Sequence, residues 1–134
     1  MPKTLKIKGS IYWQDPLELP EQDELTIQVA PHAKVTLVER LKKNSKCHRL
    51  IKAGAYSQVR FVTIQELPAT MNLEELRESE VAEGARVHFF TCHLGGKEIK
   101  SSILQHGKGA SAHCDTDLLT RTRDNQSFQF ILKN

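Results

Sequence analysis

The sequence contains few aromatic residues, few prolines and glycines, and no long apolar run. Aromatic residues make up 6% of the 134 residues, beside 7 glycines and 5 prolines. This composition excludes a collagen-like repeat and a low-complexity linker, and it supplies few rings for stacking on nucleic-acid bases. No stretch approaches the roughly 20 apolar residues that a membrane-spanning helix needs. The sequence therefore predicts no transmembrane segment.

The cysteine count is low and odd. Cys47, Cys92 and Cys114 are the three cysteines, and three thiols cannot all pair within one chain, whereas small secreted domains usually carry an even number. The cationic start of the chain, residues 1–8, has no apolar segment behind it and does not resemble a signal peptide. As written, the sequence predicts a cytoplasmic protein.

The share of core-forming residues is ordinary, with 39% hydrophobic and 26% charged residues. Such a composition supports a hydrophobic core, and the length is typical of one globular domain. We therefore expect a single domain over residues 1–134.

The formal net charge of +3 conceals a strong segregation of charge. Residues 34–60 hold eight cations against Glu39, whereas residues 66–83 hold six glutamates against Arg77. Charge segregation of this kind is a property of surfaces and partners. The two blocks either face each other in the folded chain or form a surface that binds a charged partner.

Apolar and polar residues alternate along much of the chain, which is typical of half-buried strands. Short polar segments separate the alternating stretches, and Gly95-Gly96 and Asp124-Asn125 indicate hairpin turns. The expected strands cover residues 5–13, 25–29, 34–41, 47–53, 58–67, 86–94, 98–105, 118–123 and 127–133.

One segment has a different pattern. Asn72 and Glu75 have the spacing of a capping box, and Leu73, Leu76 and Val81 follow at helical intervals. This predicts one short peripheral helix over residues 73–82. Together with about eight short strands, it predicts a mostly β fold, an antiparallel β-sandwich or barrel.

Each cysteine is adjacent to a histidine, in Cys47-His48, Cys92-His93 and His113-Cys114. Cysteine and histidine are zinc ligands, but the chain has no C-x₂-C knuckle, and neighbouring residues of a strand point to opposite faces. The sequence therefore predicts no metal site and no cofactor, with a site built from the three cysteines as the alternative.

Nothing in the sequence has the spacing of a catalytic site, because the carboxylates lie in the acidic connection at residues 14–26 and in the predicted helix. We therefore expect that the protein is not an enzyme. The residues most suited to a partner are cations of the predicted basic hairpin, residues 34–52, since cations between strands can track a phosphate backbone. The candidate partner-binding or anion-binding residues are Lys42, Lys43, Lys46, Arg49 and Lys52.

Three stretches carry a resemblance to a known family. Residues 8–13 (KGSIYW), 17–20 (LELP) and 25–29 (LTIQV) resemble the opening of the YscW/YbaY family of lipoprotein chaperones, or pilotins. The resemblance implies a small β-sandwich that binds a partner's peptide at a sheet edge. It also implies a location in the periplasm or at the outer membrane, reached with a leader that this sequence lacks.

Two functions are therefore expected from the sequence. The first is a non-catalytic protein-interaction β-sandwich, pilotin-like, that binds a protein partner or self-associates through exposed edge strands. The alternative is a small β-barrel that binds RNA or DNA through the basic hairpin, residues 34–52.

Overall fold

The computed structural model describes residues 3–10, 12–121 and 126–133, and these residues form eleven β-strands and no helix. The strands are β1 (Lys3–Ile7), β2 (Leu17–Leu19), β3 (Glu24–Val29), β4 (Lys34–Leu41), β5 (Lys46–Ala53), β6 (Gln58–Gln65), β7 (Leu73–Val81), β8 (Arg86–His93), β9 (Glu98–Gly107), β10 (His113–Thr120) and β11 (Ser127–Lys133).

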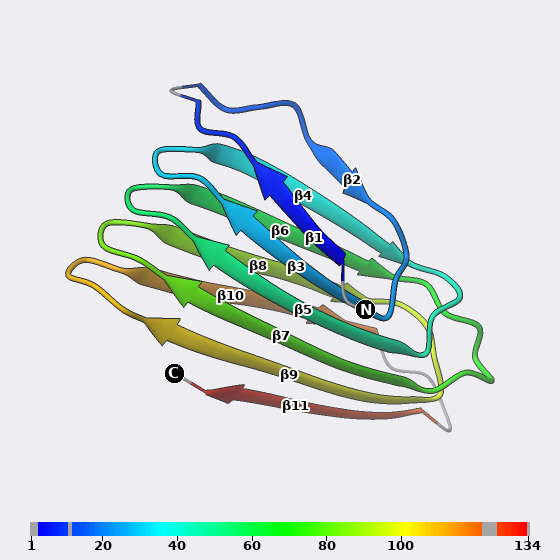
Figure 1. Cartoon of the computed structure of the whole chain (residues 1–134). Coiled ribbons are helices and arrows are strands. Elements are labelled where there is room, and N and C mark those ends of the chain that lie inside the picture. The colour runs from blue at the N-terminus through cyan, green and yellow to red at the C-terminus, as the bar shows by residue number, and fades with distance from the viewer. Residues whose placement is uncertain (1–2, 11, 122–125, 134) are drawn as a thin grey trace.

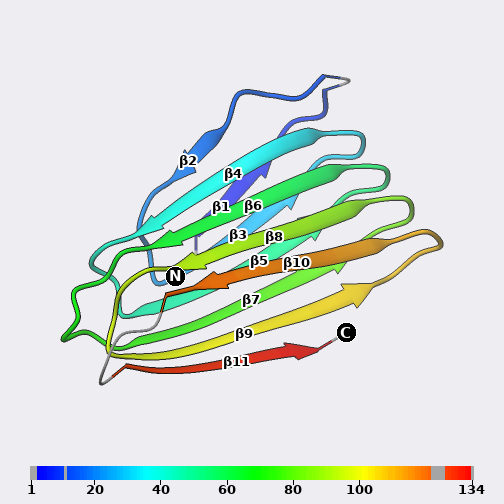
Figure 2. The same ribbon diagram turned by 180° about the vertical axis from the view of Figure 1, so that it is seen from behind.

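The strands alternate between two sheets as the chain proceeds. One sheet has the order β1-β3-β5-β7-β9-β11 and the other the order β10-β8-β6-β4-β2. All nine strand pairings are parallel. The strands of the two sheets point in opposite directions, so the chain winds as a β-solenoid in which each coil adds one strand to each sheet (Figures 1 and 2).

The expected antiparallel sandwich or barrel is therefore wrong. Strands β4 and β5, which the sequence indicated as a basic hairpin, lie in different sheets, and so do β10 and β11. Gly95-Gly96 lies at a corner between sheets, and Asp124-Asn125 falls outside the described residues. The physical reason is that alternation reports which face of a strand is buried and says nothing of the partner strand.

The predicted helix over residues 73–82 is also wrong, because this segment is strand β7. Its inward-facing residues include Glu75 and Arg77, both buried. With charged residues on the buried face, the apolar residues no longer alternate, and Leu73, Leu76 and Val81 acquire a helical spacing by coincidence. The Asn72 side chain accepts a hydrogen bond from the Glu98 backbone at 3.2 Å, so it joins two coils.

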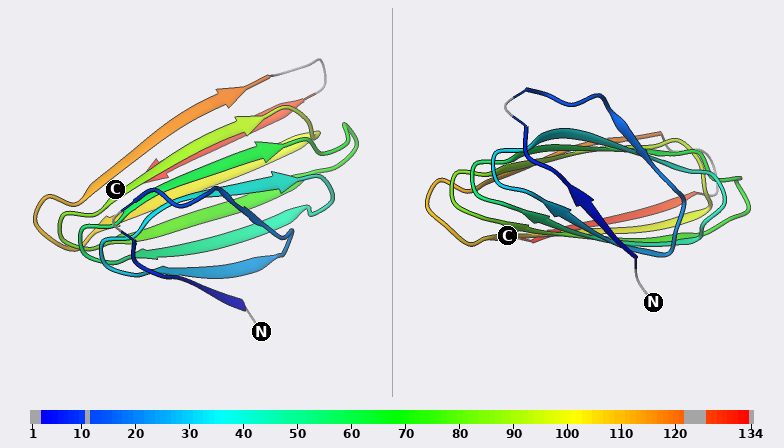
Figure 3. Two further views of the ribbon diagram at one scale, coloured as in Figure 1. Left: turned by 90° about the horizontal axis from the view of Figure 1, so that it is seen from above. Right: turned by 45° about the horizontal axis from the view of Figure 1, so that its top comes forward.

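The corners that lead from the six-stranded to the five-stranded sheet share one turn geometry. His32, Tyr56, Gly84 and Ser111 occupy equivalent positions in four successive corners, each with a positive φ between 59° and 67°. The stacked corners are joined by backbone hydrogen bonds and form one long edge of the solenoid (Figure 3). At Gly84 a Cβ atom would lie 2.3 Å from the Tyr56 ring, so this corner requires glycine.

The main hydrophobic core fills the space between the two sheets. Inward-facing residues of both sheets interdigitate there, and the rings of Phe61 and Phe89 lie 5.8 Å apart between centroids. The core is formed by Ile7, Leu19, Leu25, Ile27, Val29, Ala33, Val35, Leu37, Ile51, Ala53, Val59, Phe61, Val81, Ala85, Val87, Phe89 and Ile103.

The outward-facing parts of the two charge blocks on β5 and β7 meet on the outer face of the six-stranded sheet. Basic β5 pairs with acidic β7, which places Lys46 beside Glu74 and Lys52 beside Glu80. His48 Nε2 lies 3.2 Å from an oxygen of Glu78 in the same pair of strands. Parts of the two charge blocks thus face each other across one strand pair, and each such exposed pair adds about 0.2–1 kcal/mol.

Candidate functional site

The residues inside the solenoid form three layers along the strand direction. In β4, Leu37 and Leu41 are apolar, and Glu39 between them is fully buried. The other strands continue this pattern, so a polar layer separates the main core from a small apolar cluster that includes Leu41 and Cys47. The buried side chains of the polar layer are Glu39, Arg49, Thr63, Gln65, Glu75, Arg77, Thr91, His93 and Ser101.

Two arginines and two glutamates form the centre of the polar layer. Arg49 Nε donates to Glu39 Oε1 at 2.6 Å, and Arg77 Nη2 lies 3.2 Å from Glu39 Oε2. Arg77 Nη1 lies 2.7 Å from Glu75 Oε2. All four side chains are 0% exposed, so two positive charges and two negative charges are buried together. Their formal charges cancel, which a buried ionic cluster requires.

His93 and Ser101 complete the surroundings of Glu75. His93 Nε2 lies 2.8 Å from Glu75 Oε1, and the Ser101 hydroxyl donates to the same oxygen at 2.6 Å. The Gln65 amide nitrogen lies 3.4 Å from His93 Nδ1. Glu75 is thus flanked by His93 and Ser101 on one oxygen and by Arg77 on the other.

The charges of this cluster stabilise one another. Burial alone would raise the pKa of Glu75, but the Arg77 charge, the adjacent His93 and the hydrogen bond from Ser101 outweigh it and lower the pKa to about 2. Burial alone would likewise lower the pKa of Arg77, but Glu75 raises it above its ordinary value. Both groups are therefore charged throughout the neutral pH range.

The acid stability of the protein is expected to depend on Glu75. A carboxyl group whose pKa is about 2 when folded and 4.5 when unfolded stabilises the fold fully above pH 4.5, and this contribution disappears as the pH falls toward 2. Urea unfolding measured from neutral pH down to about pH 2 should show this loss. A Glu75→Gln variant should lose less stability than the wild type over the same interval, and equal slopes would contradict this role for Glu75.

Cys47 adjoins the polar layer. Its Sγ lies 3.5 Å from Glu39 Oε1, and the residue is 1% exposed. Burial raises the pKa of the Cys47 thiol to about 12, although the charge of Arg77 opposes the shift. The thiolate is the form of cysteine that acts as a nucleophile or a metal ligand. Cys47 is therefore unreactive toward alkylating agents and metal ions while the interior stays closed.

One corner of the polar layer leaves no room for a side chain. A Cβ on Gly95 would lie 2.1 Å from the Leu67 carbonyl oxygen, and Gln65 bonds both Leu67 N and Gly95 O. Gly95→Ala is therefore expected to lower the free energy of unfolding by about 1–3 kcal/mol. Gly107→Ala is the control, since its Cβ meets only Ala112 at an ordinary 3.5 Å. Chemical denaturation of both variants tests this prediction. Equal losses in the free energy of unfolding would contradict the close approach at Gly95.

The structure distributes the five predicted partner-binding residues over three places. Lys42 and Lys43 are exposed at the turn between β4 and β5, and Lys46 and Lys52 lie on the outer face of the six-stranded sheet. Arg49 is instead fully buried in the polar layer. The four lysines thus share the surface of one coil, while Arg49 belongs to the interior.

The three cysteines are free thiols, and the alternation of β-strands separates each from its neighbouring histidine. Cys47 points inward and His48 outward, whereas His93 points inward and Cys92 outward. Since Cys92 lies on an outer face, the three thiols are not brought together. Within residues 3–10, 12–121 and 126–133, no group of three or more His, Cys, Asp or Glu side chains is placed to hold a metal ion.

The family of the protein follows from comparison with known proteins. A family model described as SUF system FeS cluster assembly, SufBD core domain, matches residues 15–133. The chain belongs to the SufBD core-domain family. Searches against curated proteins and against solved structures each gave no match.

Membership of the SufBD family corrects the functions expected from the sequence. The resemblance to YscW/YbaY pilotins is wrong, since the matching family is another one and strands β2 and β3, which carry part of the resemblance, pair in parallel in a solenoid. Pilotin-like peptide binding and the alternative of RNA or DNA binding through residues 34–52 are wrong for the same reason. The SufBD match indicates a role in iron–sulfur cluster assembly. No helix within the described residues has the length and apolar character needed to cross a membrane.

Proposed function

We propose that this protein takes part in iron–sulfur cluster assembly as a scaffold component of a SUF system. The match of a SufBD core-domain model to residues 15–133 carries the proposal. The solenoid supports it, because its two outer sheet faces and its edge strands offer long surfaces to partner proteins. The iron–sulfur cluster is the product of such a system, and several proteins assemble it together.

Depletion of the protein in its source cells tests this function. We expect the activity of an iron–sulfur-dependent dehydratase to fall, while a dehydrogenase without a cluster keeps its activity. Re-expression of residues 1–134 should restore the dehydratase. If both enzymes keep full activity after depletion, the proposed function is wrong.

We further propose that two copies of the chain associate through the edge strands β10 and β11. Among the residues that the structure describes, each of these strands pairs on one side only, with β8 and β9 respectively. Leu118, Leu119, Ile131 and Leu132 on these strands are between 37% and 64% exposed. Unpaired backbone groups beside exposed apolar side chains favour strand addition by a partner.

Sedimentation equilibrium tests the association. The wild type is expected to form dimers, and a Leu119→Lys, Ile131→Lys double variant is expected to stay monomeric with an unchanged circular dichroism spectrum, since lysine disfavours edge pairing. Leu17→Lys is the control, because Leu17 is similarly exposed at 37% but lies on β2 at the opposite edge. A wild type that is monomeric up to its solubility limit would contradict the proposal.

We also propose that the chain is not itself an enzyme and that it resides in the cytoplasm. The first proposal is supported by the ionic cluster, in which each carboxylate is paired with an arginine, and by the raised pKa of Cys47. The second is supported by three free cysteines, which suit a reducing compartment. Substrate turnover that a single side-chain substitution abolishes would contradict the first.

A further inference from the structure

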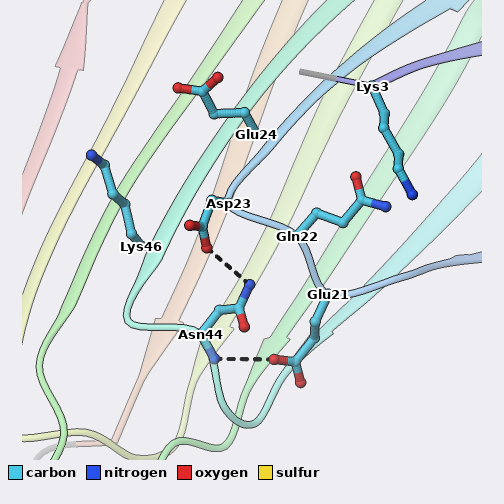
Figure 4. A pocket seen from close by; sticks show the side chains of 7 residues that line it. All are labelled: Lys3, Glu21, Gln22, Asp23, Glu24, Asn44 and Lys46. Atoms are coloured by element: carbon cyan, nitrogen blue, oxygen red, sulfur yellow. Dashed lines mark hydrogen bonds between the residues drawn. The ribbon is translucent and has the colours of Figure 1, made fainter. Parts of the chain in front are cut away.

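The corner at residues 20–23, here called the strap, is bound by the backbone of the neighbouring corner. Glu21 Oε1 accepts a hydrogen bond from Lys42 N at 2.8 Å, and Glu21 Oε2 accepts from Lys43 N and Asn44 N, each at 3.0 Å. Successive backbone N–H groups that converge on one anion form a nest. Glu21 thus occupies an anion-binding turn of the same chain (Figure 4).

The strap also covers part of the polar layer. Arg49 Nη2 donates to the Gln22 carbonyl at 2.7 Å and Nη1 to the Asp23 carbonyl at 3.4 Å, and Arg49 is 0% exposed. Arg49 Nε binds Glu39, whose carboxylate also contacts the Cys47 thiol. Removal of the strap would therefore open the side of the interior where Cys47 lies.

Besides Glu21 and Arg49, the strap is held by Asp23, which accepts from Asn44 Nδ2 at 3.3 Å and from His48 N at 2.7 Å, whereas the strand before it is weakly anchored. Strand β2, which leads into it, pairs with β4 over three residues, whereas β4 pairs with β6 over eight. An open pocket of about 640 Å³ lies beside the strap, with Lys3, Glu24 and Lys46 among its lining residues (Figure 4). In a solenoid each coil contacts only its neighbours, and regions with few buried contacts open locally at low free energy.

We propose that Glu21 is the latch of the strap, and that its release exposes Arg49 and Cys47 while the remaining coils stay folded. The device is independent of the role in iron–sulfur cluster assembly, since it rests on the contacts of residues 20–23 alone. Its consequence is that the unreactive thiol of Cys47 becomes reactive when the strap opens, because the thiol then regains the pKa of an exposed cysteine.

Alkylation under native conditions tests the latch. In Glu21→Gln an amide NH₂ replaces one of the two oxygens that face the three N–H donors. N-ethylmaleimide is expected to modify Cys47 at least about tenfold faster in this variant than in the wild type, since charge-assisted hydrogen bonds are lost. Peptide mass spectrometry gives the rate for each cysteine, so Cys92 and Cys114 serve as references within the same molecules.

Two further variants and one measurement separate the latch from general destabilisation. Glu24→Gln is the matched control, because Glu24 is exposed and lines the same pocket, and its Cys47 rate should equal that of the wild type. Glu21→Asp keeps the charge but shortens the side chain, so an intermediate rate is expected. Amide hydrogen exchange at His48, whose N–H donates to Asp23 O at 2.7 Å, should accelerate in Glu21→Gln. A Cys47 rate that equals the wild-type rate, or that follows global unfolding measured in urea, would overturn the proposal.

Discussion

Replacement of Glu75 by glutamine is expected to lower the free energy of unfolding by about 3–5 kcal/mol, as urea denaturation at neutral pH should show. Glu75 Oε2 lies 2.7 Å from Arg77 Nη1, and both side chains are fully buried. Without the Glu75 charge, two buried arginines share the single carboxylate of Glu39. An uncompensated buried charge is among the most destabilising changes that a single substitution causes.

The neighbouring residue on the same strand provides the control for Glu75. Glu74 points outward and is exposed, so Glu74→Gln should change the stability by less than about 0.5 kcal/mol. Combining Glu75→Gln with Arg77→Met should recover much of the lost stability. The effects of substituting the two partners of a buried ion pair are not additive. Equal effects of Glu74→Gln and Glu75→Gln would contradict the ionic cluster.

Phe89→Ala is expected to lower the free energy of unfolding by about 3–5 kcal/mol. The Phe89 ring is fully buried against Phe61 between the two sheets, so its removal leaves a cavity. Thermal and urea denaturation should both report the loss.

The next residue on the strand again gives the matched control. Phe90 lies on the outer face, is partly exposed, and stacks on His88 at 3.8 Å between ring centroids. Phe90→Ala should therefore lose less than half as much stability as Phe89→Ala. Losses of equal size would contradict this assignment of the two faces of β8.

The sequence was sufficient to predict the predominance of β-strands and the position of several of them, but not the fold. The alternating stretches at 34–41, 47–53 and 86–94 closely match β4, β5 and β8. It was insufficient to predict the partner of each strand, because parallel and antiparallel pairing bury the same alternate residues. Corners such as Gly95-Gly96 have the composition of hairpin turns, although they connect two sheets.

The interior cluster was missed because charged residues were interpreted as surface residues. Arg49 was assigned to a basic hairpin and Glu75 to a helix cap, and both are buried. One signal was available: Glu39 shares the alternation phase of Leu37 and Leu41, so it points to the same face as two core residues. A charge on the apolar phase of a strand indicates a paired interior site, but its partner lies on another strand and cannot be identified from spacing.

The polar layer between two apolar layers has a further consequence for how the coils align. A shift of one coil by two residues along the strand direction would keep the same side chains facing inward. In a uniformly apolar core, such a shift would cost little free energy. In this solenoid the same shift would move Arg77 or Glu39 into an apolar layer and separate each from its counter-ion. The ionic cluster thus acts as an alignment key, which selects one stacking of the coils among several that hydrophobic burial alone would accept.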